Sequence, residues 1–207
     1  MGIYRTRVLP RIMNVAMSSD ENREIRARVC NGLEGTVVEI GFGSGLNVPF
    51  YPAAVHTVHA VEPLERSYAI ARERIDASHV EIHLAGLTGE RLDLPAGCAD
   101  AVLSTWTLCS IPDLGAALAE ICRVLKPGGA LHFVEHGISP DAKVARRQAR
   151  FEPFTKPVFG GCHLTRDIPD FITSAGFVID PLNVYSHPKE PKPFGWTFEG
   201  IARLFAP

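Results

Sequence analysis

The sequence predicts an α/β fold in which helices cover both faces of a largely parallel β-sheet. Two observations support this prediction. Short apolar runs rich in β-branched residues alternate with segments of helical periodicity along most of the 207 residues, and this order is typical of βαβ units. A glycine-rich turn also stands between the first such run and the segment that follows it, where an α/β fold brings its backbone close to a ligand.

The composition is that of a globular protein that handles a small molecule. Hydrophobic residues make up 46% of the chain and charged residues 21%, with a formal net charge of −2. We therefore expect one domain over residues 1–207 and no binding of nucleic acid. No apolar run reaches the roughly 20 residues that cross a bilayer, so no integral membrane segment is expected. The oligomeric state is not predicted.

The cysteines point to a reducing compartment. They are odd in number, widely spread and without paired CxxC spacing: Cys30, Cys98, Cys109, Cys122 and Cys162. Free thiols, and hence a cytoplasmic location, are expected.

The first half of the chain predicts an N-terminal helical segment, residues 1–35, followed by three strands. The capping signal around Ser19 predicts a helix. The strands are TVVEIG from Thr36, TVHAVE ending at Glu62, and VEIHLA from Val80. A short, Pro-interrupted helix follows the first strand, and LERSYAIARERI predicts a longer one between the second and third strands.

The second half continues the alternation. ADAVLST from Ala99 predicts a buried strand, a helix begins near Asp113 and stops at the breaker KPGG, and GALHFVEH predicts a strand that ends at His136. Two further strands are expected at FVIDPL and TFEGIARLF.

Between the fifth and sixth predicted strands lies a segment, residues 137–176, with helical patterns of its own. Residues 141–159 have a helical pattern that Pro153 and Pro157 are expected to break. IPDFITSAGF predicts a second helix, with either Asp167 or Thr165 as its N-cap.

The glycine turn EIGFGSG places a carboxylate, Glu39, two residues before Gly41, with Gly43 and Gly45 following. Glycine permits a sharp turn and close approach to a ligand. About 20 residues further on, Glu62 ends the second strand, where an acidic side chain accepts hydrogen bonds from ribose hydroxyls. The spacing therefore predicts a ligand that contains adenosine.

Charge selects among such ligands. A dinucleotide fingerprint needs a third glycine where this chain has Leu46, and Glu39 would repel a pyrophosphate. The same carboxylate would attract an ammonium group. S-adenosylmethionine carries an ammonium and a sulfonium and no phosphate, so it fits better than NAD.

Four stretches then resemble the successive motifs of class I S-adenosylmethionine-dependent methyltransferases: EIGFGSG, VEP, ADAVLSTWTLCSIPD and RVLKPGGALHFVEH. The resemblance implies a Rossmann-like three-layer sandwich. Its sheet would have seven strands, mostly parallel, with the last strand antiparallel.

The resemblance also implies site residues. The methionine end of the cofactor would be held by Glu39, Gly41, Gly43 and Gly45, the ribose by Glu62 beside Pro63, and the methyl region by the backbone of Thr105. Many relatives contact adenine through an acidic residue after the third strand. Here Leu87 and Thr88 occupy that position, so backbone contacts are expected instead.

TLCSIPD, VEHG and GCHLTRD resemble more narrowly the branch that includes alkyl-thiol S-methyltransferases and their bacterial relatives. This resemblance implies a thiol or lipophilic acceptor. The family resemblance also implies that residues 137–176 form an insertion on the acceptor side of the site. Because some bacterial members are labelled phospholipid or quinone methyltransferases, methylation at S, N, O or C stays open.

Methyl transfer is an in-line displacement in which alignment of the reactants does much of the work. His136 and His163 are the candidates to assist or orient the acceptor, with a structural polar role as the alternative for each. Trp106 is a candidate to pack on cofactor or acceptor, and Arg166 to anchor a polar acceptor group.

The cluster GGCHLTRD raises the question of a metal site. Adjacent side chains of Cys162 and His163 diverge, and no second ligand pair stands at tetrahedral-site spacing. The sequence therefore predicts no metal. Cys109 is expected either to face the pocket or to be a buried apolar thiol.

The leading hypothesis is a methyltransferase that uses S-adenosylmethionine and releases S-adenosylhomocysteine. Two alternatives remain, a cofactor-binding sensor without turnover and an NAD-dependent oxidoreductase.

Overall fold

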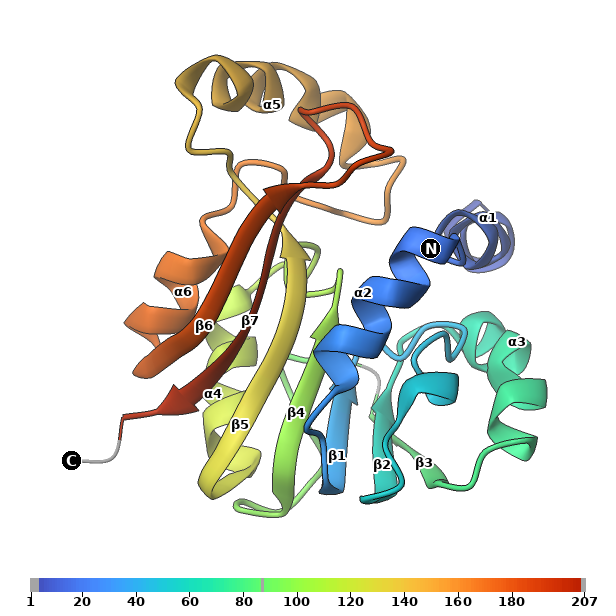
Figure 1. Cartoon of the computed structure of the whole chain (residues 1–207). Helices are drawn as coiled ribbons and strands as arrows, with labels where there is room; N and C mark the ends of the chain where they lie inside the picture. Colours follow the sequence, from blue (N-terminus) through green and yellow to red (C-terminus); the bar gives the residue numbers. More distant parts are fainter. Residues whose placement is uncertain (1–3, 87, 206–207) are drawn as a thin grey trace.

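The computed structural model describes residues 4–86 and 88–205, and within them seven strands form one sheet with helices on both faces (Figure 1). The strand order is β3-β2-β1-β4-β5-β7-β6, and β7 pairs antiparallel with both of its neighbours, whereas the pairs from β3 to β5 are parallel. The predicted fold class is thus confirmed. The strands are β1 (Gly35–Ile40), β2 (Val55–Val61), β3 (Glu81–Gly86), β4 (Ala99–Thr105), β5 (Leu125–His136), β6 (Phe177–Ser186) and β7 (Trp196–Leu204).

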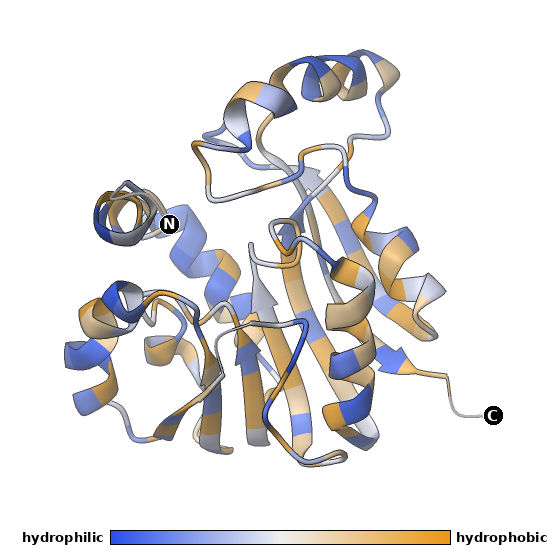
Figure 2. Cartoon of the chain, turned by 180° about the vertical axis from the view of Figure 1, so that it is seen from behind, coloured by the Kyte–Doolittle hydropathy of each residue, from blue (hydrophilic) through white to orange (hydrophobic). Residues whose placement is uncertain are grey.

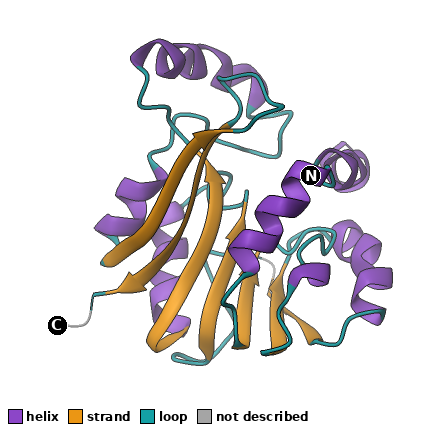
Figure 3. Cartoon of the chain, in the orientation of Figure 1, coloured by secondary structure: helices purple, strands orange, loops and turns teal. Residues whose placement is uncertain are grey.

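Figure 3 shows the helices as layers beside the strands of the sheet. They are α1 (Leu9–Ala16), α2 (Asp20–Cys30), α3 (Glu65–Asp76), α4 (Leu114–Val124), α5 (Ala142–Thr155) and α6 (Ile168–Ser174), with a π-helical turn η1 (Tyr4–Val8) and a 3-10 turn η2 (Val48–Phe50).

Two apolar cores lie on opposite faces of the sheet, because successive residues of a strand point to opposite sides. Val37 and Val38 of β1 are both fully buried, the first beneath α2, η2 and α3 and the second beneath α4 and α6. In Figure 2 the central strands are accordingly coloured mostly apolar. Burial on both faces explains why these strands are near-continuous apolar runs in the sequence.

Helix starts follow their capping residues. The side chain of Ser19 accepts a hydrogen bond from the backbone N–H of Asn22 at 3.3 Å. Asp167, not Thr165, caps α6: its Oδ1 accepts from the N–H of Asp170 at 3.2 Å. The hydroxyl of Thr165 instead donates to Glu152 at 2.7 Å.

Two predicted boundaries are wrong. Helix α5 continues through Pro153 to Thr155. There the carboxylate of Glu152 accepts two hydrogen bonds from Thr165, a tertiary contact that stabilises this end of the helix. Strand β5 begins at Leu125, directly before the expected breaker KPGG, and runs through it, because Leu125 pairs with Ala99 of β4.

The N-terminal segment closes over one end of the sheet. Both α1 and α5 lie beyond the carboxyl ends of the central strands (Figure 1). The hydroxyl of Tyr4 donates to the carbonyl of Val158 at 3.0 Å and joins the two segments. Among the described residues, no helix is long and apolar enough to cross a membrane.

Candidate active site

A cavity of about 800 Å³ lies at the carboxyl ends of the parallel strands, where open α/β sheets bind their ligands. One wall is formed by Leu9 and Met13 of α1 and by the C-cap residue Met17. The ends of the strands and the loops that follow them supply further lining residues, in chain order Gly41, Gly43, Ser44, Glu62, Pro63, Thr88, Glu90, Thr105, Trp106 and His136. Leu87, expected near adenine, lies outside the described residues.

The turn after β1 requires its glycines. Gly41 has a φ of +76°, and a Cβ there would overlap the side chain of Thr107. Gly45 has a φ of +71°, and its Cβ would come within 3.1 Å of Ala71 on α3. Gly41 and Gly43 line the cavity, whereas Gly45 lets the turn pack against α3. Positive φ and close neighbours thus both require glycine at Gly41 and Gly45.

Glu62 is fixed at the end of β2. Its two carboxylate oxygens accept hydrogen bonds from the N–H groups of Gly43 and Leu64, each at 2.8 Å. Its side chain lines the cavity although the residue is only 6% exposed, and burial raises the pKa of its carboxyl group. The side chain of Ser67 also hydrogen-bonds to this carboxylate. Because two carboxylate oxygens offer about four lone-pair sites, Glu62 can still accept a further hydrogen bond from a diol.

Glu39 lies deeper than the sequence predicts for a ligand contact. It is 1% exposed and is not among the residues that line the cavity. The amide of Asn47 donates to it at 2.9 Å, and the hydroxyl of Tyr51 also donates to it. Burial raises the pKa of Glu39 to about 7, although these two hydrogen bonds lower it. The carboxylate of Glu39 therefore contacts Asn47 and does not line the cavity.

Arg26 of α2 is a cavity residue that the sequence analysis missed. Its Nη1 donates to Asn47 at 2.7 Å and to the hydroxyl of Thr105 at 3.0 Å. Burial lowers its pKa to about 10, partly offset by Glu39, so it stays charged at neutral pH. Its Nε is buried without a hydrogen-bond partner. A buried guanidinium with an unused donor fits a carboxylate ligand.

A signal for Arg26 was present in the sequence. The helical stripe of Ile25 and Val29 predicts which face of α2 is buried, and a charged residue directly beside Ile25 lies at the edge of that face. Glu90 is a second cavity residue that was not predicted, and it lies in the loop after β3. It supplies an acidic side chain four residues after Gly86, where relatives are expected to place one directly after the glycine.

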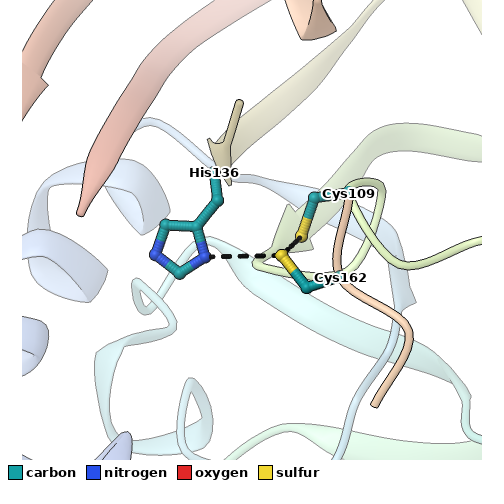
Figure 4. Close-up of side chains that lie close together, drawn as sticks. All are labelled: Cys109, His136 and Cys162. Carbon is teal, nitrogen blue, oxygen red and sulfur yellow. Dashed lines mark hydrogen bonds between the residues drawn. The ribbon is translucent and has the colours of Figure 1, made fainter. Parts of the chain in front are cut away.

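The other end of the cavity is lined by sulfur and imidazole (Figure 4). Cys162 Sγ lies 3.4 Å from Cys109 Sγ and 3.9 Å from His136 Nδ1. The paired thiol and burial raise the pKa of Cys109, whereas Cys109 and then His136 lower the pKa of Cys162. Burial lowers the pKa of His136, but Cys162 and Glu190 outweigh it and raise the pKa overall. The ring of Trp106 lies 6.4 Å from that of His136.

His163 and Arg166 do not line the cavity. The ring of His163 lies 3.3 Å from a carboxylate oxygen of Glu152, and its backbone N–H donates to the carbonyl of Cys109 at 2.9 Å. Arg166 donates to the carbonyls of Leu108 and Ile111 at 2.7 and 2.8 Å. Both residues join the segment after α5 to the loop after β4, and so hold Cys162 beside Cys109.

Comparison with known proteins agrees with this geometry. A family model described as a methyltransferase domain matches residues 38–133. The thiol S-methyltransferase TMT1B of Homo sapiens is 30% identical over 202 residues, which cover 93% of this chain and 80% of that protein. TMT1B of Rattus norvegicus is 34% identical over 167 residues, covering 79% of this chain and 66% of that protein.

Solved structures show the same fold. A SAM-dependent methyltransferase from Thermotoga maritima is 25% identical and superposes with a TM-score of 0.67, covering 97% of this chain and 96% of that one. This class of enzyme uses S-adenosylmethionine as methyl donor. The unpartnered Nε of Arg26, the fixed carboxylate of Glu62 and the glycine turn fit that molecule. The chain belongs to the class I S-adenosylmethionine-dependent methyltransferases, in the branch that contains the thiol S-methyltransferases.

Proposed function

We propose that the protein transfers the methyl group of S-adenosylmethionine to the sulfur of a small thiol. One observation supports this most directly. A single cavity joins the polar residues Arg26 and Glu62 to an end lined by His136, Cys109 and Cys162. The cavity therefore has one end suited to the cofactor and another suited to a soft, sulfur-containing acceptor. The names of the two TMT1B relatives favour the same acceptor class.

The cofactor end assigns roles to individual residues. Arg26 binds the methionine carboxylate, and Glu62 accepts hydrogen bonds from the ribose hydroxyls. Glu39 accepts a hydrogen bond from Asn47 and so fixes that side chain, while the adenine lies near residues 88–90. When bound, the cofactor supplies an electrophilic methyl group on a positively charged sulfur.

The acceptor end aligns the reactants. Trp106 and His136 line the cavity with their rings 6.4 Å apart, and Leu9 and Met13 of α1, with the C-cap residue Met17, cover the cavity with apolar surface. Holding the acceptor sulfur in line with the methyl group gives an effective concentration of ~10⁵ M or more. His163 and Arg166 act as positioning residues, because they hold the cysteine-bearing segments together.

We also propose that the protein works in the cytoplasm. Cys109 and Cys162 are free thiols although their sulfur atoms lie 3.4 Å apart. A reducing compartment keeps such a pair unoxidised.

Labelled methyl transfer tests the proposed function. The purified chain is incubated with methyl-labelled S-adenosylmethionine and a panel of alkyl thiols, primary amines, phosphatidylethanolamine vesicles and a hydroquinone. We expect S-methyl products from thiols, detected by mass spectrometry, with one S-adenosylhomocysteine released per methyl group. The Glu65→Gln variant serves as control, because Glu65 is exposed at the start of α3.

The other outcomes separate the alternatives. Methylation of amines, lipids or quinols in preference to thiols would contradict the acceptor class. Binding of S-adenosylhomocysteine by calorimetry without turnover on any acceptor would favour a sensor. Tighter binding of NAD than of S-adenosylmethionine would favour an oxidoreductase.

A further inference from the structure

The end of the cavity brings together three side chains from distant parts of the chain. Cys109 follows β4, His136 ends β5 and Cys162 follows α5. One ligand atom from each residue, the two Sγ atoms and a ring nitrogen, lies within 4.8 Å of the other two (Figure 4). All three residues line the cavity.

The distances match a tetrahedral zinc ion with small adjustments. Zn–S bonds of about 2.3 Å and Zn–N bonds of about 2.0 Å at tetrahedral angles place two sulfurs about 3.8 Å apart and a sulfur and a nitrogen about 3.6 Å apart. Here Cys109 Sγ and Cys162 Sγ are separated by 3.4 Å, and Cys162 Sγ and His136 Nδ1 by 3.9 Å. Thiolate and imidazole are ligands that suit zinc.

Neighbouring residues orient the side chains of this cluster. His136 turns Nδ1 toward Cys162, and its Nε2 lies 3.7 Å from a carboxylate oxygen of Glu190, as ligating histidines commonly pair their second nitrogen. The buried carboxylate of Glu135 accepts hydrogen bonds from the N–H groups of Thr107 and Cys109, both at 3.0 Å, and so fixes the loop that carries Cys109. Two nearby carboxylates also favour a divalent cation.

We propose that Cys109, His136 and Cys162 bind one zinc ion, whose fourth position faces the cavity and takes the sulfur of the acceptor thiol. Three protein ligands and one open position are the arrangement of catalytic zinc sites. The role in acceptor binding rests on the proposed function, whereas metal binding itself does not.

Zinc would activate the acceptor without redox chemistry. A thiol that coordinates zinc is deprotonated, and its proton leaves to solvent. A sulfur lone pair of the thiolate then forms the new S–C bond to the methyl carbon. The bond between that carbon and the cofactor sulfur breaks, and its electron pair stays on the cofactor sulfur. The products are a methyl thioether and neutral S-adenosylhomocysteine.

Metal content and cobalt spectroscopy test the site. The full chain, purified with a reductant and dialysed, is analysed for zinc by plasma mass spectrometry, and the metal-free protein is titrated with Co²⁺ alone. We expect about one zinc per chain, and thiolate-to-cobalt charge-transfer absorption with tetrahedral visible bands. We expect the dissociation constant for Co²⁺ to rise at least tenfold in each of the variants Cys109→Ser, Cys162→Ser and His136→Gln. Cys98→Ser, which alters a half-buried thiol outside the cluster, should retain the metal.

Folding and function are checked separately. Calorimetry with S-adenosylhomocysteine shows that each variant keeps its cofactor site. Adding a small alkyl thiol to the cobalt protein should shift the visible bands, because the thiol enters the fourth position.

Absence of zinc and of a cobalt spectrum in the reduced wild-type chain would overturn the proposal. So would methyl transfer to thiols that is unchanged by a chelator and by Cys162→Ser, although the proposed function would then stand. Cobalt binding at the three residues without methylation of any thiol would support the metal site and contradict the proposed function instead.

Discussion

The guanidinium of Arg26 lies over the indole ring of Trp106, with its Cζ atom 4.8 Å from the ring centroid. Trp106 has a φ of +52°, and its backbone N–H donates to the carbonyl of Val134 at 2.7 Å, which fixes the backbone of this residue at the end of β4. Helix α2 of the N-terminal segment therefore contributes to the wall of the cavity. In the proposed complex, the methionine end of the cofactor contacts a residue that precedes the first strand, Arg26.

Arg26→Met should weaken binding of S-adenosylhomocysteine by about 10- to 100-fold. The substitution keeps much of the side-chain length but removes hydrogen bonds to a charged group, which contribute about 1.5–3 kcal/mol. Calorimetry measures the effect. 5′-Methylthioadenosine, which lacks the amino-acid moiety, provides the control and should bind with unchanged affinity. An equal loss for both ligands would mean that Arg26 only supports the fold.

Glu62→Ala should reduce affinity for S-adenosylhomocysteine by about tenfold or more, because it removes the ribose acceptor and the anchor of the Gly43 and Leu64 amides. Affinity is measured by calorimetry against Glu65→Gln, an exposed carboxylate on the neighbouring helix. Unchanged affinity in Glu62→Ala would contradict the assignment of the ribose contact.

Gly41→Ala should destabilise the protein more than Gly128→Ala. Both glycines have positive φ, +76° and +83°, so each substitution costs about 1–2 kcal/mol in backbone strain. Only at Gly41 does the added Cβ also meet a side chain, that of Thr107, whereas Gly128 has open space around it. Urea unfolding of the two variants tests this difference. Equal losses would show that the close contact with Thr107 is unimportant.

The stability contributed by Glu39 should depend on pH. Burial raises the pKa of its carboxyl group from 4.5 to about 7, so the folded state favours the protonated form. Its contribution is fully present below about pH 4.5 and is lost as the pH rises through 7. We expect the free energy of unfolding to fall by up to about 3 kcal/mol over this range from this residue.

Glu39→Gln, which is neutral at every pH, isolates that contribution. The free energy of unfolding of variant and wild type is measured with urea at pH 5 and at pH 8. Between these pH values the wild type should lose more stability than the variant. Parallel pH dependence in the two proteins would indicate that Glu39 titrates normally in the folded state.

Local sequence patterns predicted the order of helices and strands well. The β-branched runs are buried on both faces of the sheet, and Ser19 and Asp167 cap helices as expected. The errors lie where a distant segment decides a boundary. Pro153 stays within α5 beside the contact between Glu152 and Thr165, and Leu125 joins β5 through its pairing with Ala99.

The site was predicted unevenly for the same reason. The glycine turn and Glu62 belong to one local motif, so their spacing indicates their role. Arg26 comes from a helix outside that motif, and Glu39, inside it, is turned away from the cavity toward Asn47 and Tyr51. Whether a charged side chain reaches a ligand depends on packing that spacing does not encode.

The sequence by itself determined the α/β class, the family and the cofactor, because these depend on periodicity and on motifs contained in short segments. Only the tertiary structure decided which side chains share the acceptor end of the cavity. Within GGCHLTRD it turned Cys162 toward the cavity and His163 toward Glu152, and it placed Cys109 and His136 beside that cysteine. His136 lies 27 positions after Cys109 and 26 before Cys162. Parallel pairing of β4 and β5 brings the carboxyl ends of these two strands to one edge of the sheet.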